Sequence, residues 1–405
     1  MSTAGQAEAG ALPEPITTSP AEVLRRFVQG DLASLRVFVV LAVIWAIFQI
    51  ENSSFLTALN LTNLFLQITA VGLISVGVVF VLLLGEIDLS VGAVSGLTSA
   101  VMAVESAKHG WSAYTAIGAG IVVGVVWGLI QGFLFTQFTI PSFVVTLAGL
   151  LIAQGALLKV LGSTGTVNIT DGKISGLANH TYSTGVGWVM AVVVIAVYAG
   201  GNLWAWRDRV RKRLEDTQIT GPLIRIVLVA AGTIDAVAVL NSNRGVPLAV
   251  LILVAFVAGM QYVATRTRFG RHVYAVGGNA EAARRAGIRV AYVRIAVFGI
   301  AGGMAAIGGI MAASRSLAVT QNSGGSDLLL LAIAGPVIAG TSLFGGRGSV
   351  WTALLGALVI GSISNGMDLL ALDSSIKFMV TGGVLAAAVI VDALARRSRQ
   401  AQGRV

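Results

Sequence analysis

Apolar stretches alternate with short polar breaks along the chain from Leu35 onward. Each stretch runs for roughly 16 to 25 residues, which is enough for a helix to cross about 30 Å of hydrocarbon. We therefore expect an all-α, polytopic membrane helix bundle of about twelve transmembrane helices. They should lie near residues 35–50, 62–84, 88–106, 111–135, 140–161, 187–206, 222–241, 248–265, 292–313, 326–343, 351–371 and 376–392.

The two ends of the chain differ from this apolar region. Residues 1–34 are rich in Ala, Pro, Ser and Glu, and they should form a disordered cytoplasmic tail without a cleavable signal. Residues 35–392 should form the transmembrane domain, and residues 393–405 a basic cytoplasmic tail.

The 27 Lys and Arg residues set the orientation, because cationic loops stay on the cytoplasmic side of a membrane. With the N-terminus inside, most of them fall in cytoplasmic breaks, including 207–213, 266–294 and 396–404. An even number of spans then places both termini in the cytoplasm. This sorting explains the net charge of +9 without a nucleic-acid partner, and the basic residues should contact anionic lipid headgroups.

Composition excludes several functional classes. Charged residues make up 11% of the chain, whereas a soluble globular protein carries about 25%. The chain has no Cys and three scattered His, so we expect no bound metal. It has no G-x-x-x-x-G-K-[ST], H-E-x-x-H or G-x-S-x-G motif, so we expect no catalytic residues and no ATPase site in this chain.

Three polar segments interrupt the apolar pattern. The first runs from Gly85 to Gly92, where Asp88 could cap the following helix and the two glycines would permit a sharp turn. We favour such a cytoplasmic turn over a proton or ion relay. Its candidate residues are Gly85, Glu86, Asp88, Ser90 and Gly92.

The second segment lies between Arg266 and Arg294 and predicts a short surface helix. Asn279 is a good N-cap, Glu281 suits a first turn, and Gly287 can end the helix. Alanines give the helix a small, smooth face, which favours docking into a groove of another protein over an ordinary cationic loop. The candidate residues are Gly277, Gly278, Asn279, Glu281, Ala282, Ala283, Arg284 and Gly287.

The third segment runs from Gly340 to Val350 and places Gly345, Gly346 and Arg347 at a cytoplasmic end. Its Ser349-Val350 pair echoes Ser90-Val91, which is compatible with an internal duplication.

A separate regularity occurs in the fourth span, where glycines recur every four residues on one helix face. That face should lie inside the bundle against another backbone, and its glycines are Gly120, Gly124, Gly128 and Gly132.

The chain resembles the permease subunits of bacterial ATP-binding-cassette (ABC) sugar importers of the ribose and xylose branch over most of residues 60–392. The resemblance is carried by 61–64, 85–92, 140–149, 268–288 and 340–350. It implies a multi-pass protein of the bacterial cytoplasmic (inner) membrane that translocates a monosaccharide by alternating access. It also implies a cytoplasmic ATPase subunit that uses ATP and Mg, an extracytoplasmic sugar-binding protein and a second permease subunit. We expect the second permease subunit to be another copy of this chain, so that the two form a homodimer. Residues 275–287 would then be the region that couples to the ATPase.

Two departures from the family pattern bear on substrate and role. Glu86 stands where the family commonly has a second Gly, so this turn carries an extra charge. Ribose-type members also lack much of residues 162–247, which here include the added helix pair 187–241. This longer layout resembles the xylose-type permeases, and we expect xylose or a related pentose as the substrate.

A sugar path needs amides, hydroxyls and aromatic faces. The candidates are Gln67, Gln131, Gln154, Asn365, Trp127 and Trp351. Hydrogen bonding between helices and interfacial anchoring are alternative roles for each of them. The outer loop 162–187 could receive the binding protein or be an unstructured connector.

A proton-coupled secondary sugar transporter acting alone is the alternative function. It is disfavoured because few carboxylates fall deep within the expected spans.

Overall fold

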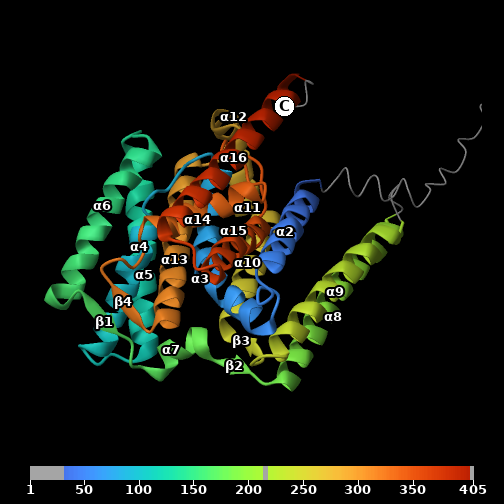
Figure 1. Ribbon diagram of the computed structural model, residues 1–405. Helices are drawn as coiled ribbons and strands as arrows, with labels where there is room; N and C mark the ends of the chain where they lie inside the picture. Colours follow the sequence, from blue (N-terminus) through green and yellow to red (C-terminus); the bar gives the residue numbers. More distant parts are fainter. Residues whose placement is uncertain (1–31, 213–217, 402–405) are drawn as a thin grey trace, which may run out of the picture.

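A computed structural model describes residues 32–212 and 218–401 of the chain as a helical bundle (Figure 1). Its first half contains α2 (Leu32–Glu51), α3 (Ala58–Leu83), α4 (Val91–Ala107), α5 (Ala113–Gln137), α6 (Ser142–Leu161), the 3-10 helix η1 (Gly162–Thr164), β1 (Thr166–Asn168), α7 (Gly172–Asn179), β2 (Thr181–Tyr182) and α8 (Thr184–Arg211). Its second half contains α9 (Thr220–Asn241), β3 (Val246–Pro247), α10 (Leu248–Arg266), α11 (Arg268–Gly278), α12 (Ala280–Arg285), α13 (Val290–Ser316), β4 (Ala318–Thr320), α14 (Ser326–Ile338), α15 (Trp351–Leu369) and α16 (Ser374–Ala401).

Each of the twelve expected apolar stretches contains a helix. Within the described residues, eight helices are long and apolar enough to cross a membrane. Val37–Glu51, α4 and α14 are shorter apolar helices. The polytopic helix bundle is therefore confirmed, whereas the count of twelve crossings and the cytoplasmic location of both termini stay predictions.

The expected tails are only partly covered by the structure. The predicted tail 1–34 lies outside the described residues, apart from its last three residues, which begin α2. At the other end, α16 continues to Ala401, so the expected start of the basic tail at residue 393 falls inside a helix.

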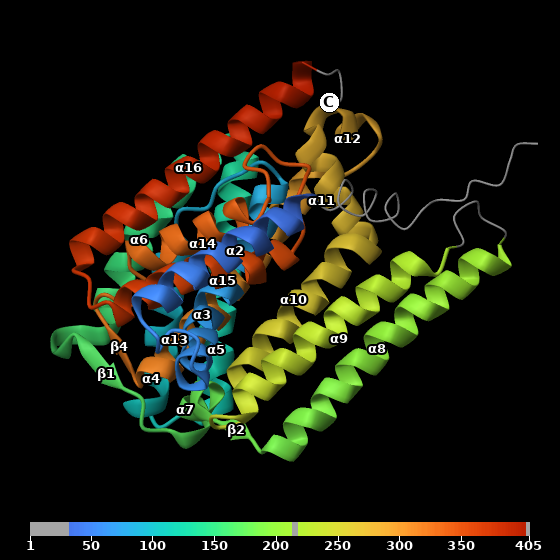
Figure 2. The same ribbon diagram turned by 45° about the vertical axis from the view of Figure 1, so that its right-hand side comes forward.

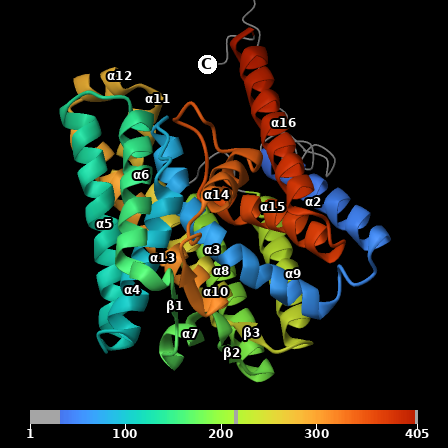
Figure 3. The same ribbon diagram turned by 60° about the vertical axis from the view of Figure 1, so that its left-hand side comes forward.

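Helices α3 and α13 lie at the centre of the bundle and are the most buried of the span-length helices described. α4, α5 and α6 cover one side, while α10, α14 and α15 cover the other (Figures 1 and 3). α8 and α9 form a hairpin that stands away from the bundle (Figure 2). We call the end that carries α11 and α12 the α12 end, and the opposite end, with β1 to β4 and α7, the strand end.

The glycine face of α5 packs inside the bundle as predicted. All four of its glycines are buried. At Gly124 and Gly128, an added Cβ would meet the backbone of Gly302 and Phe298 on α13. The absence of side chains therefore allows α5 and α13 to approach through their backbones.

The loop 162–187 contains η1, β1, α7 and β2, so of the two alternatives left open for it the unstructured connector is wrong. β1 pairs antiparallel with β4, with Val167 opposite Val319, and β2 pairs with β3. The side chain of Asp171 accepts hydrogen bonds from two backbone amides of the first turn of α7. The Ser314 hydroxyl, at the end of α13, accepts from the Ala178 amide at 2.9 Å. These contacts fix α7 across the strand end of the bundle.

Helices α4 and α14 are shorter than the roughly 20 residues of a typical spanning helix. Their 17 and 13 residues correspond to about 25 and 20 Å. The non-helical segment 321–325 precedes α14 and enters the bundle beside the first turns of α4. There an added Cβ at Gly92 would lie 3.0 Å from the Gly324 carbonyl oxygen. An added Cβ at Gly96 would overlap the Ser323 carbonyl oxygen. α4 therefore begins within the protein, and the segment that leads into α14 packs against the first turns of α4.

Replacing Gly128 by Ala should lower stability, because the added methyl group would overlap the Phe298 carbonyl. Overpacking of this kind costs about 1 to 3 kcal/mol. The matched control is Gly118→Ala on the same helix, where the added Cβ meets nothing within 4 Å. Melting temperatures in detergent would check the prediction, and equal melting of the two variants would contradict it.

Candidate functional site

The three polar segments selected from the sequence meet at the α12 end of the bundle. The Gly346 amide donates to the Leu83 carbonyl at 2.9 Å. Gly85 lies against the Phe344 carbonyl, and Gly277 of α11 lies against Leu83. We call this meeting of the end of α3, the end of α11 and the loop 340–350 the glycine junction.

Glycine is required at two positions of the junction for steric reasons. A Cβ on Gly277 would overlap the Leu83 carbonyl oxygen. Gly345 has φ of +83°, and a Cβ there would lie 2.6 Å from the Gly277 carbonyl oxygen. A side chain at either position would push the three backbones apart.

Side chains of α10 and α11 hold the loop 340–350 in place. The Tyr274 hydroxyl of α11 donates to the Gly348 carbonyl at 2.8 Å. Burial raises the pKa of Tyr274, a direction that favours the neutral phenol over the phenolate. On α10, the Gln261 side-chain oxygen accepts from the Ser349 hydroxyl at 3.0 Å and from the Val350 amide at 2.8 Å.

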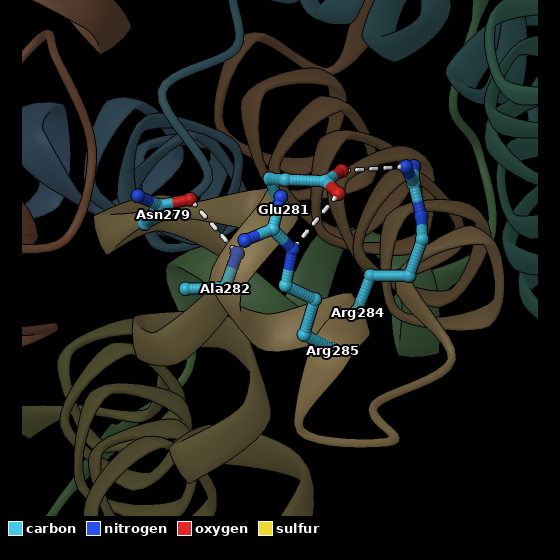
Figure 4. A network of polar contacts seen from close by, with 5 residues as sticks. All are labelled: Asn279, Glu281, Ala282, Arg284 and Arg285. Atoms are coloured by element: carbon cyan, nitrogen blue, oxygen red, sulfur yellow. Dashed lines mark hydrogen bonds and ion pairs between the residues drawn. The ribbon is translucent and has the colours of Figure 1, made fainter.

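Helix α12 extends from α11 and forms as predicted (Figure 4). The Asn279 side chain accepts from the Ala282 amide at 2.9 Å, and Gly287 ends the segment with φ of +82°. Glu281 pairs with Arg284 at 2.9 Å and with Arg285 at 3.4 Å.

One member of the expected docking face of α12 is placed differently. Ala283 is 5% exposed and packs with the core, whereas Ala282 and Ala286 are exposed. The sequence alone did not show which side of this short helix meets α13. The free face therefore contains Ala282, Ala286, Arg284 and Arg285, and Gly278 is also exposed beside it.

Glu86 forms an ion pair that connects distant parts of the chain. Its carboxylate lies 3.2 Å from the Arg294 guanidinium of α13, and both side chains are largely buried. The same guanidinium lies over the Phe135 ring of α5, 4.9 Å from its centroid. Glu86 therefore joins the segment after α3 to both α5 and α13.

Asp88 does not cap α4 as expected. The N-cap is Ser90, whose side chain makes no capping bond. Instead, Asp88 accepts from the Ser90 amide at 2.8 Å and from the Ser90 hydroxyl at 2.6 Å. The Ser90 hydroxyl also lies 3.0 Å from the Gln131 side-chain oxygen of α5. Asp88 is 4% exposed, so it is a buried carboxyl group and not part of an open turn.

The six residues suggested for a sugar path do not converge. Gln131 and Trp127 face α6 at Gly149, whereas the Asn365 side-chain oxygen accepts from the Asn60 amide group at 2.7 Å. Gln154 and Trp351 are exposed. Of the six, Gln67 lines a cavity, a small space of about 30 Å³ between α3, α14 and α15.

A larger cavity of about 220 Å³ was not indicated by the sequence analysis. It lies between α14, α15 and α16. The charged residues Asp327 and Lys377 in expected apolar spans were the available signal, because ionisable groups there are rare. Its polar and aromatic lining includes Asp327, Ser364, Ser374, Lys377, Phe378 and Thr381.

Comparison with protein families matched residues 60–389 to one described as "Branched-chain amino acid transport system / permease component". The chain is 38% identical over 371 residues to the xylose transport system permease protein XylH of Escherichia coli (strain K12), covering 90% of this chain and 93% of the relative. It is 35% identical over 364 residues to the Haemophilus influenzae XylH, with 89% and 96% covered. The ribose import permease protein RbsC of Bacillus subtilis is 33% identical over 366 residues, with 90% and 94% covered. Comparison with solved structures gave no match.

Tyr274→Phe should loosen the loop 340–350, because the Gly348 carbonyl loses its donor. The loss of one such bond corresponds to about 1 kcal/mol. Tyr262→Phe on α10 is the matched control, since Tyr262 is 64% exposed. A lower melting temperature for Tyr274→Phe than for the control is expected, and equal values would contradict a role for this bond.

The ion pair between Glu86 and Arg294 can be measured with a double-mutant cycle. Glu86→Gln and Arg294→Gln should each destabilise the protein, because each leaves a largely buried charge without its partner. The double variant should be more stable than the sum of the single effects predicts, with a coupling of about 1 kcal/mol. Additive changes in thermal stability would show that the pair contributes nothing.

Proposed function

The chain belongs to the branched-chain amino acid transport system / permease component family, and on that premise we propose that it is the membrane permease subunit of an ABC importer for a monosaccharide. Relatives named for xylose and ribose match about nine tenths of the chain, which supports a sugar over an amino acid. Identity is higher to the E. coli xylose permease than to the B. subtilis ribose permease. We therefore propose xylose or a related pentose as the cargo.

The observation that carries this proposal is the connection from the exposed helix α12 to the buried helix α3. A separate ATPase subunit would bind ATP and Mg and dock on the free face of α12. Because α11 ends in the glycine junction against Leu83, a displacement of α12 would reach α3 and the loop 340–350 directly. This is the contact that alternating access driven from outside the chain requires.

The remaining partners follow from the same assignment. The α12 end lies on the cytoplasmic side of the bacterial inner membrane, because the cationic segment 266–294 is at this end. The strand end faces outward, where the ordered loop 162–187 offers a surface for a sugar-binding protein. Two copies of the chain form the complete pore, with the α8–α9 hairpin at the periphery of each.

One observation favours the alternative of a stand-alone, proton-coupled carrier. Asp88 is a buried carboxyl group, which the sequence analysis did not foresee and which a proton relay would need. Both hydrogen bonds that it accepts come from Ser90, a neighbour in the same turn, so the carboxylate already has a structural role. The importer remains the better-supported proposal.

Reconstitution separates the two functions. Proteoliposomes containing the chain, a candidate ATPase and a binding protein should take up radiolabelled xylose on ATP addition. Each omitted protein should abolish uptake. Uptake driven by a pH gradient without the ATPase would instead establish the carrier.

Ala282→Trp should weaken docking of the ATPase, because Ala282 lies on the free face of α12. We expect at least tenfold less co-purified ATPase and a corresponding loss of uptake, with an unchanged melting temperature. Ala107→Trp, at an exposed position far from α12, is the control for docking and should co-purify with the ATPase like the parent. Normal ATPase binding by Ala282→Trp would overturn the docking role of α12.

A further inference from the structure

We propose that the cavity between α14, α15 and α16 is a binding site for the sugar within this chain. The inference rests on the proposed importer function and adds the location of the cargo. The cavity has a volume of about 220 Å³ and lies where three helices that follow one another in the sequence leave a gap. None of its lining residues belongs to the glycine junction or to α12.

The lining provides the groups that a polyhydroxylated molecule needs. Asp327, in the first turn of α14, offers carboxylate acceptors, and Ser364 and Thr381 offer hydroxyl groups that both donate and accept. Phe378 is 54% exposed and adds an aromatic surface suited to the C–H face of a sugar ring. A mostly apolar wall with a few polar groups is the usual composition of a small-molecule site.

The charged groups at the cavity are held in place by contacts outside it. The Lys377 ammonium pairs with Asp368 of α15, and this fixes the base of α16 beside α15. Because Asp368 neutralises Lys377, the cavity carries no isolated ammonium group that would demand an anionic ligand. A neutral sugar therefore fits the lining better than a phosphate or a carboxylate.

The cavity lies next to a smaller cavity that is nearer the centre of the bundle. Leu331 and Ser364 line both this cavity and the smaller one that contains Gln67 of α3. The smaller cavity, at about 30 Å³, is too small for a sugar. Passage of the cargo would require α3, α14 and α15 to separate, and α3 is the helix whose end lies in the glycine junction.

The backbone around α14 supports a functional cavity at this place. Helix α14 has 13 residues and follows the polar, non-helical segment 321–325, which enters the bundle beside α4. Non-helical backbone at membrane depth is tolerated where protein buries it or where it lines a cavity. Interrupted helices of this kind recur at the substrate sites of transporters.

Cysteine labelling tests the cavity directly, because the natural chain contains no Cys. Thr381→Cys places one thiol in the cavity, and Gly383→Cys places one on an exposed position of the same helix outside it. In nanodiscs that hold the complete transporter, saturating xylose or ribose should slow maleimide labelling of Thr381→Cys at least tenfold and leave Gly383→Cys unchanged. Equal sensitivity of the two thiols would overturn the proposal. If maleimide labelling of Thr381→Cys slows as the phosphatidylglycerol content of the nanodiscs rises but does not respond to sugar, the cavity is a lipid site and the proposal is overturned.

Blocking the cavity gives a second, functional measurement. An added Cβ meets nothing within 4 Å at Gly382 or at Gly383, but Gly382 lines the cavity. Gly382→Trp should lower ATP-dependent uptake at least tenfold while ATPase co-purification stays normal, and Gly383→Trp should transport like the parent. Equal uptake by these two variants, with normal uptake by the parent, would overturn the cavity and leave the importer function intact. Sugar protection of Thr381→Cys in a chain that shows no ATP-dependent uptake would support the cavity and overturn the importer function.

Discussion

Backbone contact at the glycine junction is the constraint on which the arrangement of the α12 end depends. Gly277 lies directly against the Leu83 carbonyl, and the Gly346 amide donates to that same oxygen. A contact between backbones has no side-chain rotamers to absorb movement, so α11, α3 and the loop 340–350 are closely held together at this point. Tyr274 and Gln261 add bonds to the same loop from α11 and α10. These contacts are the basis for the proposed coupling between α12 and α3.

Close approach of backbones also occurs inside the bundle, away from the glycine junction. The glycine face of α5 lies on α13, and Gly92 and Gly96 of α4 leave room for the segment 321–325. Apolar packing gives little directional force between helices in lipid, so short distances and polar contacts must hold them together. Asp88 and Ser90 supply such contacts at the start of α4, and Asn60 and Asn365 supply one between α3 and α15. Glycine and buried polar residues thus position the helices, whereas the apolar residues keep them in the membrane.

Features governed by neighbouring residues could be predicted from the sequence. The apolar stretches predicted the helices, and the four-residue spacing of glycine predicted the buried face of α5. Asn279 and Gly287 predicted the limits of α12. Features that depend on distant residues could not be. The partner of Glu86 is Arg294 on another helix, Ala283 turns inward because α13 lies beneath it, and the suggested amides point to different neighbours. The cavity was missed because its lining comes from three helices, and no local spacing relates Asp327, Ser364 and Thr381.

Helix α3 connects the glycine junction with the small cavity that contains Gln67. Its α12 end lies in the glycine junction, while Gln67, farther along the same helix, lines the small cavity that separates the larger one from the centre of the bundle. α3 is the most buried of the span-length helices described and packs against α13, α14 and α15, so a displacement of α3 would act on all three. The proposed sugar site between α14, α15 and α16 borders the same helices. If the proposed sugar site and the docking face of α12 are both occupied, they bias the same set of helices, and two sites that share no residue can be coupled in this way.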